Sequence, residues 1–150
     1  MVVNKKDTSG TFLSFSEEDT KQIAQSLSKF AKKGMCFSIC GDLGYGKTTF
    51  AKFLMQSLNP DISDISSPTF NIIQTYECNL AEIWHVDCYR IKSSDEFNEL
   101  GLEEAFQNCI TIIEWPEIID NYLPTNRIKI RFSITEDNNR MIHYELPKVA

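Results

Sequence analysis

Residues 35–50 read MCFSICGDLGYGKTTF and carry the most informative pattern in the sequence. Its first six residues, 35–40, form a short apolar run that predicts a β-strand. The next eight are Gly41-Asp42-Leu43-Gly44-Tyr45-Gly46-Lys47-Thr48, which satisfy the pattern G-x-x-x-x-G-K-[ST] in full. Apolar residues then recur at helical spacing (Phe50, Leu54, Leu58) until Asn59-Pro60. A strand, a glycine-rich turn and a helix in this order predict a phosphate-binding loop, or P-loop.

Each residue type in the loop has a chemical reason. The glycines allow backbone N–H groups to turn inward and approach phosphate oxygens closely. The helix that begins near Lys47 points its positive end at the same anion. We expect Lys47 to reach the β- and γ-phosphates of a nucleotide and the Thr48 hydroxyl to bind Mg²⁺.

Two carboxylates are candidates to complete this site, because a P-loop needs one acid to help hold Mg²⁺ and a group that orients the attacking water. Glu114 follows the apolar run 109–113, which suits a strand buried on both faces. Asp87 follows a second predicted strand, 81–86. Either could instead be a solvated carboxylate at a strand end, and the sequence does not decide which acid holds metal and which orients water. The only histidines, His85 and His143, are more typical of structural positions than of metal ligands.

The remaining pattern indicates an α/β fold, with a central, partly parallel sheet flanked by helices and antiparallel strands towards the C-terminus. Ser16 is expected to cap a helix that Gly34 closes, and the acidic stretch from Ser93 is expected to be helical until Gly101. Further strands are predicted at 11–15, 70–76 and 127–134, the last with Arg127, Lys129 and Arg131 facing away from its apolar side, and residues 140–146 return as a hairpin.

Length and charge narrow the class of protein. The 150 residues predict one domain, 1–150, and the net charge of −6 without a basic run argues against direct binding of RNA or DNA. No apolar run approaches the roughly 20 residues of a membrane span, and the N-terminus lacks a signal-peptide core, so we expect a cytoplasmic protein. Five cysteines without a Cys-x-x-Cys pair predict reduced thiols rather than a disulfide or zinc site.

Several motifs coincide in order along the chain and together resemble the TsaE family. They are the P-loop extended to Thr49, then Ser67-Pro68-Thr69-Phe70, His85-Val86-Asp87-Cys88-Tyr89-Arg90, Glu99-Leu100-Gly101-Leu102-Glu103-Glu104 and Ile113-Glu114-Trp115-Pro116-Glu117. The resemblance covers about residues 12 to 135. One departure is Tyr45, where the family usually has alanine.

The resemblance implies a weak ATPase that acts with TsaB and TsaD to place threonylcarbamoyl on adenosine 37 of tRNAs reading codons that begin with A. It implies ATP and Mg²⁺ at the P-loop, with Thr48 and Glu114 as metal ligands and Asp87 as a further acid near the γ-phosphate and metal. Trp115 would lie near the nucleotide, residues 17–20 near the adenine, and residues 67–69 would be switch-like. Contact with tRNA would then be made through the partners.

A small-molecule kinase and a GTPase are the two alternative functions for a chain with a P-loop, and the rest of the sequence fits each of them less well. A small-molecule kinase usually needs an arginine-rich lid, whereas the four arginines here are scattered and no lid-sized insertion remains. A GTPase would explain Asn4-Lys5-Lys6-Asp7 as the guanine-reading N-K-x-D pattern. That tetrapeptide lies at the extreme N-terminus without a strong strand to present it, and no Asp-x-x-Gly follows the P-loop.

Overall fold

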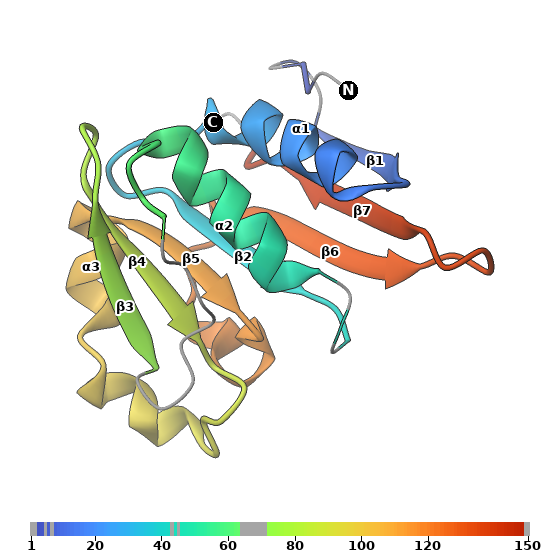
Figure 1. The fold of residues 1–150 in the computed structure, drawn as a ribbon. Coiled ribbons are helices and arrows are strands. Elements are labelled where there is room, and N and C mark those ends of the chain that lie inside the picture. The colour runs from blue at the N-terminus through green and yellow to red at the C-terminus, as the bar shows by residue number, and fades with distance from the viewer. Residues whose placement is uncertain are drawn as a thin grey trace.

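The computed structural model describes residues 3–4, 6, 8–42, 44, 46–63 and 72–148. Within these ranges one seven-stranded sheet has the order β1-β7-β6-β2-β5-β4-β3 (Figure 1). The strands are β1 Ser9–Ser14, β2 Cys36–Cys40, β3 Ile73–Glu77, β4 Glu82–Asp87, β5 Ile110–Glu114, β6 Ile128–Ile134 and β7 Arg140–Glu145. The helices are α1 Glu17–Ser28, α2 Lys47–Leu58 and α3 Leu102–Asn108, with the shorter 3₁₀ helices η1 Ser94–Glu99 and η2 Pro116–Tyr122.

The centre of the sheet is parallel and its two sides are antiparallel. Strand β2 pairs in parallel with β5 and β6, and β5 pairs in parallel with β4. Antiparallel pairs join β6 to β7, β7 to β1, and β3 to β4. The expected α/β class is therefore confirmed, including the C-terminal hairpin. Antiparallel pairing also occurs at both outer edges, β1 and β3, which the hydrophobic pattern did not predict.

Helices cover the sheet on two sides. Helices α1 and α2 lie together on one face, while α3 and the 3₁₀ helices lie on the other (Figure 1). Strand β5 has apolar side chains on both faces of the sheet, and each face is covered by a helix layer. Ile110 and Ile112 pack into the core beneath α1 and α2, whereas Ile113 packs into the core beneath α3. All five residues of β5 are buried, as its continuous apolar run predicted.

The predicted cap of the first helix is confirmed, but its predicted end is wrong. The Ser16 hydroxyl accepts a hydrogen bond from the Asp19 N–H at 3.2 Å, and the Asp19 carboxylate accepts one from the Phe15 N–H at 2.9 Å. The helix ends at Ser28, not at Gly34. Gly34 instead has φ +90° and donates its N–H to the Cys109 carbonyl at 2.9 Å, so this glycine forms the turn that leads into β2.

Two other segments differ from the expected pattern. The helical stretch from Ser93 ends before Gly101 as predicted, but α3 begins directly afterwards and η2 follows β5 without having been foreseen. Arg127 was expected to face outward with Lys129, yet it is buried. Its guanidinium donates to Asp120 Oδ1 at 2.8 Å and to the Pro124 carbonyl at 2.9 Å, which ties the segment after η2 to the start of β6.

Replacing Ile112 with alanine tests the importance of the central strand for stability. Because Ile112 is fully buried beneath the helices, Ile112→Ala should lower the free energy of unfolding by about 2–5 kcal/mol, measured by urea denaturation. The control Leu80→Ala removes the same number of methylene groups from an exposed turn and should change it by less than about 0.5 kcal/mol. Equal effects of the two substitutions would contradict the assigned core.

Candidate nucleotide-binding site

The glycine-rich turn begins at the end of β2 with Gly41, whose backbone conformation and close packing leave no room for a side chain. Gly41 has φ +138°, and a Cβ placed there would lie 2.7 Å from the carbonyl oxygen of Phe132 on β6. Gly46, with φ +95°, precedes α2 and gives its first turn no side-chain cap. The first N–H groups of α2 therefore lack a capping acceptor and can serve an anion. Leu43 and Tyr45, both predicted to bind nucleotide, lie outside the described residues.

Lys47 is held inside the turn. Its Nζ donates to the carbonyl oxygens of Gly41 at 2.5 Å and Asp42 at 2.8 Å, and lies 4.0 Å from the ring centroid of Trp115. Burial lowers the pKa of Lys47 below its ordinary value, and nearby carboxylates, Glu114 foremost, oppose that shift. The protein itself therefore supplies two hydrogen-bond acceptors and an aromatic ring to the Lys47 ammonium.

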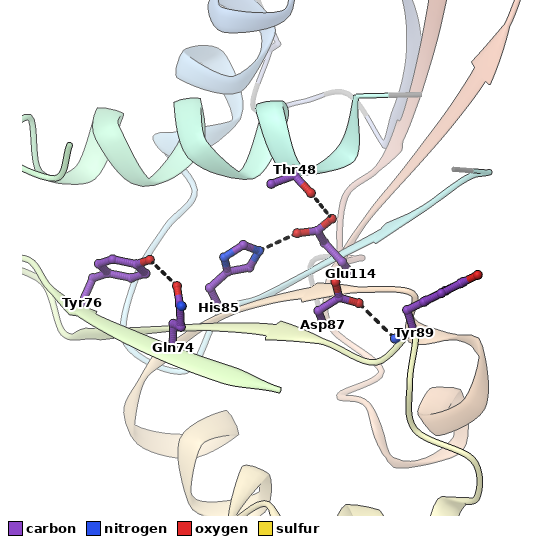
Figure 2. Close-up of polar contacts among 7 residues, drawn as sticks. All are labelled: Thr48, Gln74, Tyr76, His85, Asp87, Tyr89 and Glu114. Carbon is purple, nitrogen blue, oxygen red and sulfur yellow. Dashed lines mark hydrogen bonds and ion pairs between the residues drawn. The ribbon is translucent and has the colours of Figure 1, made fainter. Parts of the chain in front are cut away.

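The carboxylate of Glu114 is almost fully buried and is contacted from two sides (Figure 2). Its Oε1 accepts a hydrogen bond from the Thr48 hydroxyl on α2 at 2.8 Å. Its Oε2 lies 2.5 Å from His85 Nε2 on β4. Thr48 and Glu114, which with Asp87 are the three residues predicted to hold the metal, are therefore in direct contact between helix α2 and the sheet.

Asp87 lies beside this pair because the strands are in register. It is the partner of Glu114 in the parallel β4–β5 ladder, and its Oδ1 accepts a hydrogen bond from the Tyr89 N–H at 3.0 Å (Figure 2). A hollow of about 430 Å³ opens over these residues. It is lined by Gly44, Gly46, Lys47, Thr48, Thr49, Asp87, Tyr89, Glu114, Trp115 and Arg140.

A second hollow, of about 250 Å³, lies on the other side of the start of α2. It is lined by Ser14, Phe15, Ser16, Glu17, Thr20, Gly46, Thr49, Asn138, Asn139 and Arg140. The two hollows share Gly46, Thr49 and Arg140. Glu17 and Thr20 of the 17–20 segment therefore line a hollow that also contains Gly46 of the P-loop.

Several residues in these hollows were not anticipated from the sequence. Arg140, on β7, donates from its guanidinium to the Gly44 carbonyl at 3.4 Å, whereas in the sequence the arginines are scattered and none was assigned to the site. The exposed Phe15 and Tyr89 rings are further additions, and the Tyr89 ring lies 4.9 Å from that of Trp115. The sequence did contain one indication for His85. It precedes Asp87 by two residues on a predicted strand, so the two side chains are expected on the same face of the sheet.

The groups present suit Mg²⁺ better than a metal held wholly by protein. Among the described residues, no group of three or more His, Cys, Asp or Glu could hold a metal ion. A hydroxyl and a carboxylate are hard oxygen ligands, and Mg²⁺ commonly completes its coordination with phosphate oxygens and water. Burial raises the pKa of Cys88 to about 12, so this thiol beside Asp87 is not a nucleophile at neutral pH.

Other expectations from the sequence are answered only in part. All five cysteines are free thiols, as expected, although only Cys36 and Cys88 are fully buried. Residues 67–69, predicted to be switch-like, and Lys5 and Asp7 of the N-K-x-D match lie outside the described residues. No helix in the described part of the chain has the length and apolar character that crossing a bilayer requires.

Comparisons with known proteins agree with one another. The family model described as "Threonylcarbamoyl adenosine biosynthesis protein TsaE" matches residues 14–142. The chain is 41% identical over 126 residues to the tRNA threonylcarbamoyladenosine biosynthesis protein TsaE of Rickettsia bellii, covering 84% of this chain and 88% of that one. Against the protein of the same name from Bacillus subtilis it is 38% identical over 128 residues, covering 85% and 79%.

A solved structure gives the same answer for the fold. The crystal structure of Bacillus subtilis YdiB superimposes with a TM-score of 0.78 at 30% sequence identity, covering 93% of this chain and 86% of that one. The matched region contains the P-loop, Asp87 and Glu114. The chain therefore belongs to the TsaE family, which takes part in tRNA threonylcarbamoyladenosine biosynthesis.

Proposed function

We propose that this chain binds ATP with Mg²⁺ and hydrolyses ATP as a subunit that acts with TsaB and TsaD in threonylcarbamoyl modification of adenosine 37 of tRNA. The observation that supports this most directly is the contact between the Thr48 hydroxyl and the Glu114 carboxylate at 2.8 Å, beside Lys47 at the start of α2. A hydroxyl, a carboxylate and an ammonium group at a helix N-terminus are the groups that a nucleotide–Mg²⁺ complex requires.

The triphosphate would occupy the larger hollow, above the P-loop. There the N–H groups at the start of α2 and the Lys47 ammonium would bind phosphate oxygens. The smaller hollow would take the adenosine, with Phe15 offering an exposed aromatic face and Glu17 and Thr20 lining the wall. Arg140 borders both hollows and would contribute positive charge between them.

Thr48 and Glu114 would hold Mg²⁺, and their existing hydrogen bond already places both oxygens together. When bound, Mg²⁺ supplies positive charge that stabilises the charge developing on the β- and γ-phosphate oxygens. Glu114 has both of its oxygens engaged by protein donors, which suits an anchored ligand. Asp87 is less buried and faces the same hollow, which suits a residue that orients the attacking water.

Hydrolysis would then break the bond between the γ-phosphorus and the bridging oxygen, with water as the nucleophile. The oxygen of the water joins phosphorus, one of its protons stays on the phosphate and the other passes to solvent, the bridging oxygen leaves with ADP, and ADP and inorganic phosphate are released. No phosphoryl group would be donated to a product. The reaction would reset an assembly with TsaB and TsaD, whose ATP-bound and ADP-bound forms differ in stability. Since the chain carries a net charge of −6, tRNA would be contacted by the partners.

Replacing Lys47 tests nucleotide binding. Lys47→Ala should weaken binding of ATP–Mg²⁺ by at least about 10- to 100-fold, since removing one charged hydrogen-bonding group costs about 1.5–3 kcal/mol and phosphate charge is left uncompensated. Lys52→Ala removes the same charge farther along α2, outside the hollow, and should leave affinity unchanged. Isothermal titration calorimetry of both variants gives the comparison, and an unchanged affinity in folded Lys47→Ala protein would refute the P-loop role.

Replacing the two acids tests their division of labour. Glu114→Gln should leave the fold intact while raising the Mg²⁺ concentration needed for hydrolysis, because an amide lacks the negative charge that a hard cation prefers. Asp87→Asn should lower the rate at saturating Mg²⁺. If the Mg²⁺ requirement rises only in Asp87→Asn, the two roles are reversed.

Binding to partners tests the place of the ATPase in the pathway. The chain should bind TsaB–TsaD with an affinity that differs between ATP and ADP, and should show negligible affinity for free tRNA at physiological salt. Pull-down with each nucleotide and tRNA gel-shift experiments measure the two properties. Tight tRNA binding with a steep salt dependence would overturn the indirect role, as would phosphate from ATP found covalently on an acceptor.

A further inference from the structure

His85 is a fully buried histidine at the centre of the proposed site, and the roles assigned above do not use it. It lies on β4, two residues before Asp87, and its imidazole points between sheet and α2 towards Glu114 (Figure 2). Its Nε2 lies 2.5 Å from Glu114 Oε2, on the opposite side of the carboxylate from Thr48. The ring therefore contacts the carboxylate oxygen that Thr48 does not.

The other ring nitrogen indicates which tautomer is present. His85 Nδ1 is buried and has no hydrogen-bond partner among the described residues. A buried N–H without an acceptor is more costly than a bare ring nitrogen, so the hydrogen is assigned to Nε2, which faces the Glu114 carboxylate. The Nε2–H then donates to Glu114 Oε2, and the Thr48 hydroxyl donates to Oε1.

These two donors fix the carboxylate plane. A buried carboxylate needs donors to offset its lost hydration, and each of the two oxygens here receives one. If the imidazole were removed, Oε2 would lose its donor, and the side chain could regain one only by rotating towards Thr48 or solvent. Either rotation moves Oε1 away from the position at which it meets the Thr48 hydroxyl.

We infer that His85 is a positioning residue for Mg²⁺, holding Glu114 so that Oε1 stays beside the Thr48 hydroxyl. The inference rests on the proposed Mg²⁺–nucleotide function of this site. Within the described part of the chain, the hydrogen bond that the His85 ring makes is to Glu114 Oε2, so the proposed effect on Mg²⁺ would act through that carboxylate. Groups that hydrogen-bond to metal ligands in this way typically contribute 10–100-fold to metal affinity.

The chain offers a matched set of variants. His85→Gln retains an N–H donor the same number of bonds from Cβ as Nε2, whereas His85→Leu fills similar volume without a donor. His143→Leu makes the same substitution at the exposed histidine on β7, outside both hollows. Circular dichroism and urea unfolding establish that each variant is folded. Should His85→Leu not fold, His85→Asn replaces it, because its donor is one bond too short to reach Glu114.

The readout separates metal binding from nucleotide binding. ADP affinity is measured by calorimetry in EDTA, and then as a function of Mg²⁺ concentration. The inference expects His85→Leu to keep the metal-free affinity within about twofold while raising the half-saturating Mg²⁺ concentration by about 10–100-fold. His85→Gln should recover most of this loss, and His143→Leu should match the unaltered chain.

Three results would overturn the inference. These are an unchanged Mg²⁺ requirement in His85→Leu, an equal loss of metal-free ADP affinity, or a loss in His85→Gln as large as in His85→Leu. The last two outcomes would identify His85 as packing only. A different result, in which the unaltered chain shows no effect of Mg²⁺ on nucleotide binding, would reject the proposed function itself.

Discussion

The parallel pairing of β5 with β2 and β4 is the constraint on which the site depends. Parallel strands end at the same edge of a sheet, so the P-loop after β2, Asp87 at the end of β4 and Glu114 at the end of β5 meet there. In this register Ile39 and Asp87 are both partners of Glu114. A slip of one residue in β5 would turn Glu114 towards α3 and bury an isolated carboxylate in the second core.

That edge is costly to fold, because it buries charge. Lys47 and Glu114 are both nearly inaccessible. Backbone carbonyls and an indole contact the cation, which nearby carboxylates also stabilise, and a hydroxyl and an imidazole contact the anion. An uncompensated buried charge costs several kcal/mol, so these partners are part of the fold as well as of the site. An apolar replacement would often be more stable, which is consistent with the proposed ligand-binding role of this edge.

Local sequence predicted those elements of the fold whose residue pattern is typical of a single local structure. The P-loop pattern, the Ser16 cap and the buried run before Glu114 each correspond to an observed element. The end of α1 was predicted wrongly because Gly34 is used for a turn bonded to Cys109, a contact between segments 75 residues apart. Arg127 was misjudged for a similar reason, since strand alternation carries no information about the Asp120 carboxylate with which its guanidinium pairs.

In the candidate site, too, residues within local motifs could be predicted, whereas residues placed by contacts distant in sequence could not. Lys47, Thr48, Asp87 and Glu114 could be named from motif and strand position, and the structure brings them to one hollow. Arg140 could not, because its approach to Gly44 joins residues 96 positions apart through the β6–β7 hairpin. His85 was named in the sequence but read as a structural residue, since only tertiary packing reveals that its ring meets Glu114.

The position of Lys47 has a consequence for selectivity between anions. Its ammonium already contacts two carbonyl oxygens and the Trp115 ring, so any anion that recruits it must first replace those contacts. Orthophosphate can offer little more than it displaces. Under the proposed function, a triphosphate would also reach the N–H groups at the start of α2, which have no side-chain cap, and would gain interactions beyond those that Lys47 exchanges. The loop would then favour a triphosphate over orthophosphate before any part of the nucleotide base is recognised.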